Sequence, residues 1–588
     1  MQKAAFLFTI IVLTAVIFAD VSATLTRQPS VPYFLESHQF KTIEMNLFTS
    51  DVSGMLINEY GDLAWNPAFL GRLRNRKIYF DLDFGNSAQS SQPYSYYTSA
   101  DYRVYPAWFQ QTYISGIQTT PLYNLALLLP VSKKLKIGLI NRSNFDYGPF
   151  RETYYWDYRA IEANSYMDYQ AIMNDLEPQR LEVDENQQTV YSLQTDLMLA
   201  YQWTDRLHLG LKIGNYLFRL DGELYDSKWG IYPHSEFADL NDETLTISGD
   251  QYTLGLGLIF QANEKTSWGA YGELITGQST EESTSLDTSY SWSERNTDPD
   301  YFSFYDYDMT MNQTCDSDAN RKTLALSYQK KISNLLTLRS FLKYSSLKSD
   351  LGLVSASEDT TFRDRTYDTY DNNSYHFQRQ IYHAARRQNF DGKGTKNSDY
   401  WHWFIALVYH PEDDWSLFGG LQLTRQHNKT ESRDESDYYS ASDYTYQYYD
   451  PHTLAYLNTH DKYYEYTAES DRFSVHIPLG LKVQVVRGFH LIFAGEMHYY
   501  LTDSQKKGRL LYPKIESKKW KNSVLIVDDP ELNRYEEYSS QPAKDFSRSS
   551  NINIGFAYRH SSGIDLYVRS VGNLLETASW DIGLEYSW

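Results

Sequence analysis

Short polar turns recur along this chain, and each one lies between two segments in which apolar and polar residues alternate. Alternation with a period of two predicts β-strands that have one apolar and one polar face. The turns recur roughly every 60 to 80 residues, so the connections between successive hairpins are much longer than the turns themselves. Bacterial outer-membrane barrels have tight turns on the periplasmic side and long loops outside, so this rhythm predicts an all-β, transmembrane antiparallel barrel. The seven turns lie at 132–134, 204–206, 263–265, 332–334, 411–413, 486–488 and 561–563.

The pattern predicts 16 strands. Each of the seven turns joins two strands, and an opening strand at 78–84 and a closing strand at 581–588 complete the number. The opening strand carries Ile78, Phe80, Leu82 and Phe84 on one face. An even number places both chain ends in the periplasm, as in single-chain bacterial barrels. Because the first strand is short and residues 105–118 have no clear pattern, 14 strands stay open as an alternative.

The closing strand ends on an aromatic residue. Ile582, Leu584, Tyr586 and Trp588 alternate with polar or small residues, which predicts a strand with a lipid-facing side. Tyr586 and Trp588 look like the terminal signal that the barrel assembly machinery recognises in outer-membrane proteins. We therefore expect that machinery to be a partner of the chain.

The first residues are typical of a secretory signal peptide. Lys3 supplies a positive charge, residues 4–18 form an apolar run, and Val-Ser-Ala at 21–23 forms a small-residue cleavage site. The apolar run is too short to span a bilayer comfortably. The predicted organisation is a signal peptide at 1–23, a segment without lipid-facing alternation at 24–76, and the barrel at 77–588. The segment at 24–76 is either a periplasmic tail or folded into the lumen.

The composition fits a barrel better than its mean hydropathy of −0.57 suggests. Only every second residue of a barrel strand faces lipid, so polar lumen and loop residues dilute the apolar content. The 53 tyrosines and 13 tryptophans are typical of the aromatic girdles at the two membrane surfaces. A soluble, aromatic-rich β-sandwich is the alternative.

The net charge of −21 is concentrated in the segments predicted to be external loops. An acidic, hydrated surface argues against nucleic acid as a partner, because such binding needs basic patches. Outer-membrane lipids and lipopolysaccharide are the expected surroundings, and the carboxylates are either simply solvated or bridged to lipopolysaccharide by divalent cations. The single cysteine, Cys315, excludes a disulfide within the chain.

The predicted external loops are too long to serve only as connections, and such loops usually carry function or cover the barrel mouth. Residues 438–466 hold ten tyrosines. They predict either an ordered cap of extra hairpins or a tyrosine-lined binding surface. The loops are expected at 85–120, 146–188, 221–250, 278–319, 349–397, 428–471 and 502–549.

The most specific local motif is LINEYGDLAWNPAFL at 56–70. Its Asp62, Asn66, Pro67 and Ala68, followed shortly by the first strand, resemble the segment that precedes the barrel in FadL-type outer-membrane transporters. PorV-like barrels share this appearance. The resemblance implies that residues 24–76 form a plug, or hatch, in the lumen and that a small hydrophobic ligand is carried. An Asn-Pro turn without a special role is the alternative interpretation.

Charged residues and histidines occupy the polar face of several predicted strands, and this face must point into the barrel. Pairing of opposite charges would avoid a desolvation cost of several kcal/mol for each isolated ion. A selectivity ring, or a metal or proton site, is the functional alternative. The inward group near the carboxy terminus is Arg559, Asp565, Arg569 and Glu585, and the histidine group is His490, Glu496 and His498.

These patterns predict a passive transporter or channel in the bacterial outer membrane, with a lumen occluded by the N-terminal segment. A non-transporting scaffold for adhesion or for a secretion or envelope complex is the alternative. An outer-membrane hydrolase would need a nucleophile within reach of a histidine at the rim. Since no phosphate-binding loop, zinc-ligand spacing or catalytic triad stands out, we expect no enzyme activity, no cofactor and no metal.

Overall fold

The computed structural model describes residues 40–48, 51–56, 58–83, 121–148, 187–232, 235–295, 301–371, 374–412, 415–539, 543–571 and 579–588. The predicted signal peptide, the loop predicted at 85–120, most of that at 146–188, and Phe84 lie outside these ranges.

Seventeen antiparallel strands form one sheet that closes on itself. The closure is made by β1 (Lys77–Asp83), which pairs with β2 (Pro121–Pro130) on one side and β17 (Ser579–Ser587) on the other. The other strands are β3 (Leu135–Gly148), β4 (Gln187–Thr204), β5 (Leu207–Tyr232), β6 (Ser235–Asn263), β7 (Thr266–Arg295), β8 (Tyr301–Lys331), β9 (Leu336–Asp371), β10 (Ser374–Glu412), β11 (Trp415–Tyr448), β12 (His452–Val486), β13 (Phe489–Lys521), β14 (Val524–Ser539), β15 (Ala543–Arg559) and β16 (Ile564–Val571).

Sixteen strand positions surround the lumen, because β14 and β15 are successive parts of one position. The outer part of β13, residues 507–521, pairs with β14, whereas its inner part, residues 489–504, pairs with β15. The prediction of 14 to 16 strands is thus confirmed at its upper value. Each predicted turn falls where two consecutive strands meet, and only Asp413 among the turn residues lies outside the described chain.

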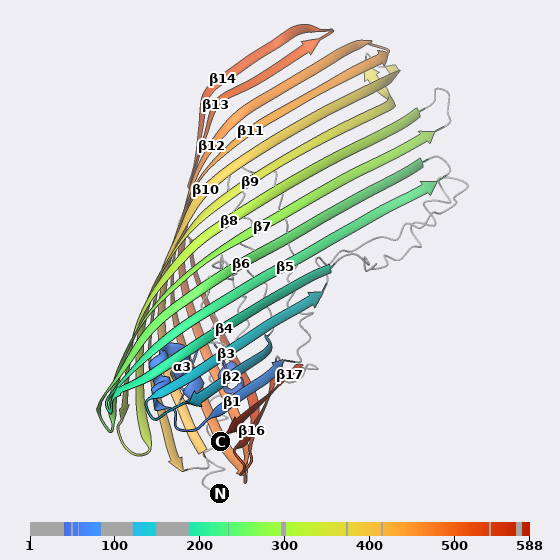
Figure 1. Ribbon diagram of the computed structural model, residues 1–588. Helices are drawn as coiled ribbons and strands as arrows, with labels where there is room; N and C mark the ends of the chain where they lie inside the picture. Colours follow the sequence, from blue (N-terminus) through green and yellow to red (C-terminus); the bar gives the residue numbers. More distant parts are fainter. Residues whose placement is uncertain are drawn as a thin grey trace.

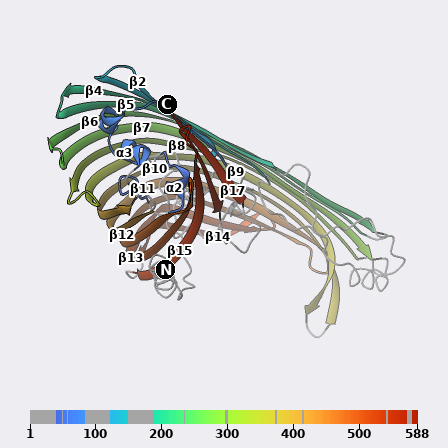
Figure 2. The same cartoon turned by 90° about the horizontal axis from the view of Figure 1, so that it is seen from below.

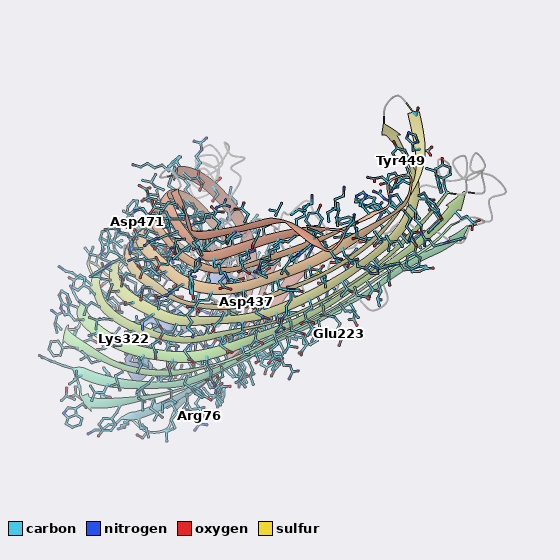
Figure 3. All side chains as sticks on the ribbon, turned by 90° about the horizontal axis from the view of Figure 1, so that it is seen from above. Arg76, Glu223, Lys322, Asp437, Tyr449 and Asp471 are labelled. Atoms are coloured by element: carbon cyan, nitrogen blue, oxygen red, sulfur yellow. The ribbon has the colours of Figure 1, made fainter. Side chains whose placement is uncertain are left out.

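The barrel is strongly asymmetric in height. Strands β6 to β13 have 29 to 39 residues, whereas β16, β17 and β1 have 8, 9 and 7. The long strands rise on one side as a tall curved sheet, and the carboxy terminus lies at the opposite, short-turn end (Figure 1). Figure 3 shows this sheet from above, with Tyr449 near its far end.

Five segments predicted as external loops are therefore mainly strands that continue beyond the membrane. They are 221–250, 278–319, 349–397, 428–471 and 502–549, and the tyrosine-rich 438–466 belongs to β11 and β12. Both faces of these extensions carry polar residues, among them the buried, inward Ser349 and Asp434, so the period-two pattern that marks a lipid-facing strand is lost there. Their abundance of Tyr and Thr, which favour strands, was the available signal.

An outward apolar band marks the membrane-spanning part of the barrel. On β6, Leu254, Leu256 and Leu258 point outward and are 49%, 63% and 41% exposed, between Tyr252 and Phe260. Because a tilted strand crosses a bilayer in about 9 to 11 residues, this stretch has the length that a membrane requires. The alternating residues point inward, and of these Thr253 and Ile259 are 9% and 1% exposed.

Aromatic residues border the band at both ends, as predicted for a transmembrane barrel. At the short-turn end, Trp268 is directly opposite both Phe260 and Tyr328, and the Trp268 and Tyr328 ring centroids are 4.5 Å apart. At the other end, Tyr344 on β9 is opposite Trp401 on β10, with centroids 4.6 Å apart.

The segment before β1 contains short helices that lie inside the ring of strands near the short-turn end (Figure 2). They are α2 (Ile43–Asn46), α3 (Glu59–Trp65) and the 3-10 helix η2 (Pro67–Arg72). The Asn58 side chain begins α3 by accepting hydrogen bonds from the backbone N–H groups of Tyr60 and Gly61. Among the described residues, no helix is long and apolar enough to cross a bilayer.

Candidate functional site

The N-terminal segment packs against inward side chains around the barrel. The Trp65 ring lies 4.9 Å from Phe341 on β9 and 5.3 Å from Phe404 on β10, measured between centroids. On another part of the wall, the Phe48 ring lies 5.6 Å from Phe418 on β11. These side chains belong to one buried apolar cluster that includes residues of 40–73 and of the wall.

The Asn-Pro-Ala motif contacts the wall directly. Asn66 Oδ1 accepts a hydrogen bond of 2.9 Å from the Ala68 N–H, which holds the turn into η2. The Asn66 amide donates bonds of 3.1 and 3.0 Å to the carbonyl groups of Leu258 on β6 and Ala270 on β7. The side chain thus fixes both the local turn and its position on the barrel.

Two glycines in the wall make room for this motif. A Cβ atom at Gly257 would lie 2.0 Å from Asn66 Oδ1, and one at Gly210 would lie 2.2 Å from the Ala68 nitrogen. Both distances are far inside van der Waals contact. Because a glycine within a strand often marks such a close approach, these two glycines were a usable sequence signal for where the motif touches the wall.

Asp62, the first residue of the predicted motif, forms an ion pair with Arg339 of β9. The Arg339 side chain is completely buried, and its guanidinium also donates to the Leu56 carbonyl of the segment. Arg339 was not among the predicted site residues, because nothing in the pattern of β9 distinguishes this inward residue from others.

Two of the four inward residues predicted near the carboxy terminus, Arg559 and Asp565, bond to each other. Arg559 donates to Asp565 with a shortest distance of 2.7 Å, while Glu585 accepts a bond of 2.9 Å from Lys77. Arg569 donates to the carbonyl group of Asn46 in the N-terminal segment. At the chain end, the rings of Tyr586 and Trp588 are stacked with centroids 5.2 Å apart.

The predicted histidine group is only partly brought together. His498 Nε2 lies 3.2 Å from Glu496 Oε2, and His498 Nδ1 lies 2.9 Å from Nδ1 of His476 on β12. His490 precedes His498 by eight residues on β13 and lies nearer the short turn. The second histidine beside His498 is therefore His476, which was not predicted. Among the described residues, no three His, Cys, Asp or Glu side chains are arranged to hold a metal ion.

A buried polar layer lies next to the N-terminal segment on its side away from the short turns. Lys212 Nζ lies 3.5 Å from carboxylate oxygens of both Asp196 and Glu273. Glu273 also accepts a 2.6 Å hydrogen bond from the Tyr271 hydroxyl and lies 3.9 Å from the Arg321 guanidinium. Along each strand these charged residues alternate with lipid-facing residues. That alternation was a usable sequence signal for their inward orientation.

Lys343 of β9 connects this layer to the segment, since its ammonium lies 5.6 Å from the centre of a Trp65 ring. Lys343, Lys212, Glu273 and Trp65 line a cavity of about 30 Å³. A volume of this size holds about one water molecule. Polar side chains thus fill the lumen directly beside the apolar segment.

Cys315 lies on β8 opposite Glu281 of β7, beyond the aromatic border of the membrane band. Burial, reinforced by the negative charge of Glu281, raises the pKa of the Cys315 thiol to about 12. Burial also raises the pKa of Glu281 to about 8. The thiol is therefore protonated at neutral pH and a poor nucleophile.

No protein-family model and no curated protein matches the sequence. Solved structures that resemble the chain carry the names of transporters, channels and uptake receptors. The Pseudomonas putida toluene transporter TodX has 9% identity and a TM-score of 0.31, with 84% of this chain and 100% of that chain covered. A Pseudomonas aeruginosa FadL homologue has 9% identity and a TM-score of 0.28, with 91% and 95% covered. The ferric yersiniabactin uptake receptor FyuA from Yersinia pestis has 10% identity and a TM-score of 0.24, with 79% and 77% covered.

Proposed function

We propose that this protein is a bacterial outer-membrane transporter or channel that carries small hydrophobic molecules passively, and that residues 40–73 occlude its lumen. The observation that carries the proposal is the position of this segment, which packs against the inward faces of β6, β7, β9, β10 and β11. The adjacent cavity of about 30 Å³ is too small for a substrate. Passage therefore requires movement of the segment or a route around it.

The aromatic inward face of the tall sheet supports a hydrophobic ligand. The Tyr438 ring is stacked on His460 with centroids 4.6 Å apart, and His460 lies 5.6 Å from Tyr512. Tyrosine offers large contact area at low entropic cost, so such a surface suits the first capture of an apolar solute. The ligand would then diffuse from this vestibule toward the segment.

Single-channel conductance in planar bilayers tests the proposal. The mature chain from residue 24 is compared with a variant that lacks residues 24–76. We expect the mature chain to be closed or to open rarely, and the deletion variant to conduct steadily. Steady conductance by the mature chain would contradict occlusion, and silence in both proteins would contradict a transport function.

A scaffold that binds another protein is the second candidate, and β14 favours it. Among the described residues β14 pairs only with β13, so its other edge presents unpaired backbone groups. Val524, Leu525, Ile526 and Val527 at its start are between 42% and 64% exposed, far from the membrane band. Exposed strand edges with apolar side chains are sites of strand addition by a partner.

Pull-down from solubilised envelopes separates the two candidates. The scaffold is favoured if a stoichiometric partner binds the unaltered protein but not Ile526→Lys, and if both proteins are also silent in the conductance assay.

A further inference from the structure

The outward face of the barrel has an open hollow of about 710 Å³ across β4 to β8. Its polar lining comes from two neighbouring rows of directly paired residues. In an antiparallel sheet, directly paired residues point to the same face. One row runs through Tyr191, Arg219, Ser248, Thr280 and Asp316, and the other through Leu217, Asp250, Gln278 and Asp318.

The position of the hollow indicates what occupies it. Leu217 and Tyr191 at its lower edge are 42% and 40% exposed and continue the outward apolar band. Tyr252, the last aromatic residue of the band on β6, is one outward position away from the hollow residue Asp250. A hollow that begins where the apolar band ends faces the headgroups of the surrounding outer-leaflet lipids.

The lining selects among headgroups by charge. Asp250, Asp316 and Asp318 contribute three carboxylates, while Arg219 is the one cation among the described residues that line the hollow. Arg219 is itself engaged by Asp221, with bonds of 2.7 and 3.1 Å. A phosphate would meet net repulsion at this site. Uncharged hydroxyl groups would instead find acceptors on the carboxylates and both donors and acceptors on Gln278.

We propose that this hollow binds the sugar headgroup of an outer-leaflet glycolipid. The carboxylates and Gln278 bond the sugar hydroxyls, and the exposed faces of Tyr191 and Leu217 cover its apolar C–H surface. The Thr280 hydroxyl donates a 2.9 Å bond to Asp316, which orients that carboxylate. The glycolipid acyl chains then lie along the apolar band immediately below.

The chain contains a matched control for the test. Arg219 and Asp221 form an outward ion pair whose side chains are 65% and 42% exposed. Arg425 and Asp471 form another on β11 and β12, with side chains 66% and 44% exposed. Arg219 of the first pair lines the hollow and neither member of the second pair does, so removal of each pair compares two nearly identical losses of charge.

The experiment measures binding of fluorescently labelled rough-type lipopolysaccharide with a complete core to the mature protein in amine-oxide micelles. Proper folding is checked by heat-dependent gel mobility. We expect Gln278→Ala, and also Arg219→Ala with Asp221→Ala, to raise Kd about tenfold, the effect of about one lost hydrogen bond. Arg425→Ala with Asp471→Ala should leave Kd within about twofold of the unaltered protein.

Three results would overturn sugar binding in the hollow, and a fourth would overturn the membrane as its source. The first is an unchanged Kd in both hollow variants, and the second is an equal loss in the control variant. The third is complete loss of binding on addition of EDTA, which would show that divalent cations bridge the carboxylates to phosphate instead of direct sugar contact. Equally tight binding of the delipidated core oligosaccharide would overturn the membrane glycolipid as the source.

Discussion

Asn66→Ala is the most direct perturbation of the proposed occlusion. The substitution removes three hydrogen bonds, one to Ala68 and two to the wall carbonyls of Leu258 and Ala270. The Ala68 bond lies within the segment, so only the two wall bonds distinguish the attached state from a released one. A hydrogen bond contributes about 1 kcal/mol net, so the attached state should lose about 2 kcal/mol relative to the released one. Because each 1.4 kcal/mol is a tenfold change, we expect the released fraction to rise about thirtyfold.

The assay is the frequency of single-channel openings in planar bilayers. Asn58→Ala is the matched control, since Asn58 lies in the same segment but bonds only within it, to Tyr60, Gly61 and Thr42. Loss of this helix cap costs about 1 kcal/mol and should raise opening no more than about tenfold. An unchanged frequency in Asn66→Ala, or equal frequencies in the two variants, would refute the role of the wall contacts.

Three further outcomes follow from the same geometry. Gly257→Ala should increase channel openings, because its methyl group would collide with Asn66. Gly272→Ala is the control and should not increase them, because no atom lies within 4 Å of the added Cβ. Bilayer recordings compare the two variants. Asp62→Leu leaves the buried Arg339 charge without its partner, at a cost of about 3 to 5 kcal/mol, so hydrogen exchange in 58–73 should accelerate. With a thiol pKa of about 12, Cys315 should resist iodoacetamide at pH 8, and its rate should rise about tenfold per pH unit up to pH 11, as followed by mass spectrometry. A fast, pH-independent reaction would contradict the thiol's protonated state.

The part of the fold within the membrane could be predicted because one physical constraint acts on it. Lipid outside and polar groups inside impose alternation, so the outward Leu254, Leu256 and Leu258 and the short turns could be recognised locally. Beyond the membrane both faces of the sheet meet water, and alternation no longer distinguishes strand from loop. For this reason the extensions of β6 to β13 were expected as loops.

The contacts of the N-terminal segment could be predicted only in part. Asn66 and Asp62 stand in a recognisable local motif, but their wall partners are distant in sequence. Asn66 bonds a carbonyl 192 residues away, and Asp62 pairs with an arginine 277 residues away. Such pairings depend on the register of strands around the ring, which no local pattern specifies. His490 and His498 lie on the same strand, where eight residues separate them by about 27 Å. The partner that strand register brings to His498 is His476, which is distant in sequence.

The inward side chains of the barrel wall indicate that the wall is adapted to contact the N-terminal segment. A water-filled barrel has a polar interior, yet Phe341, Phe404 and Phe418 point inward and are no more than 4% exposed. Without the segment, these rings would face water, at a cost of about 1.5 to 3 kcal/mol for each side chain. A variant that lacks residues 24–76 should therefore bind anilinonaphthalene sulfonate, an anionic dye that fluoresces in apolar surroundings, in its lumen, with fluorescence beyond that of the mature chain under the same conditions. Absence of dye binding in a correctly folded deletion variant would mean that the wall collapses or rearranges to cover these rings. The inward aromatic surface could then no longer be regarded as complementary to residues 40–73.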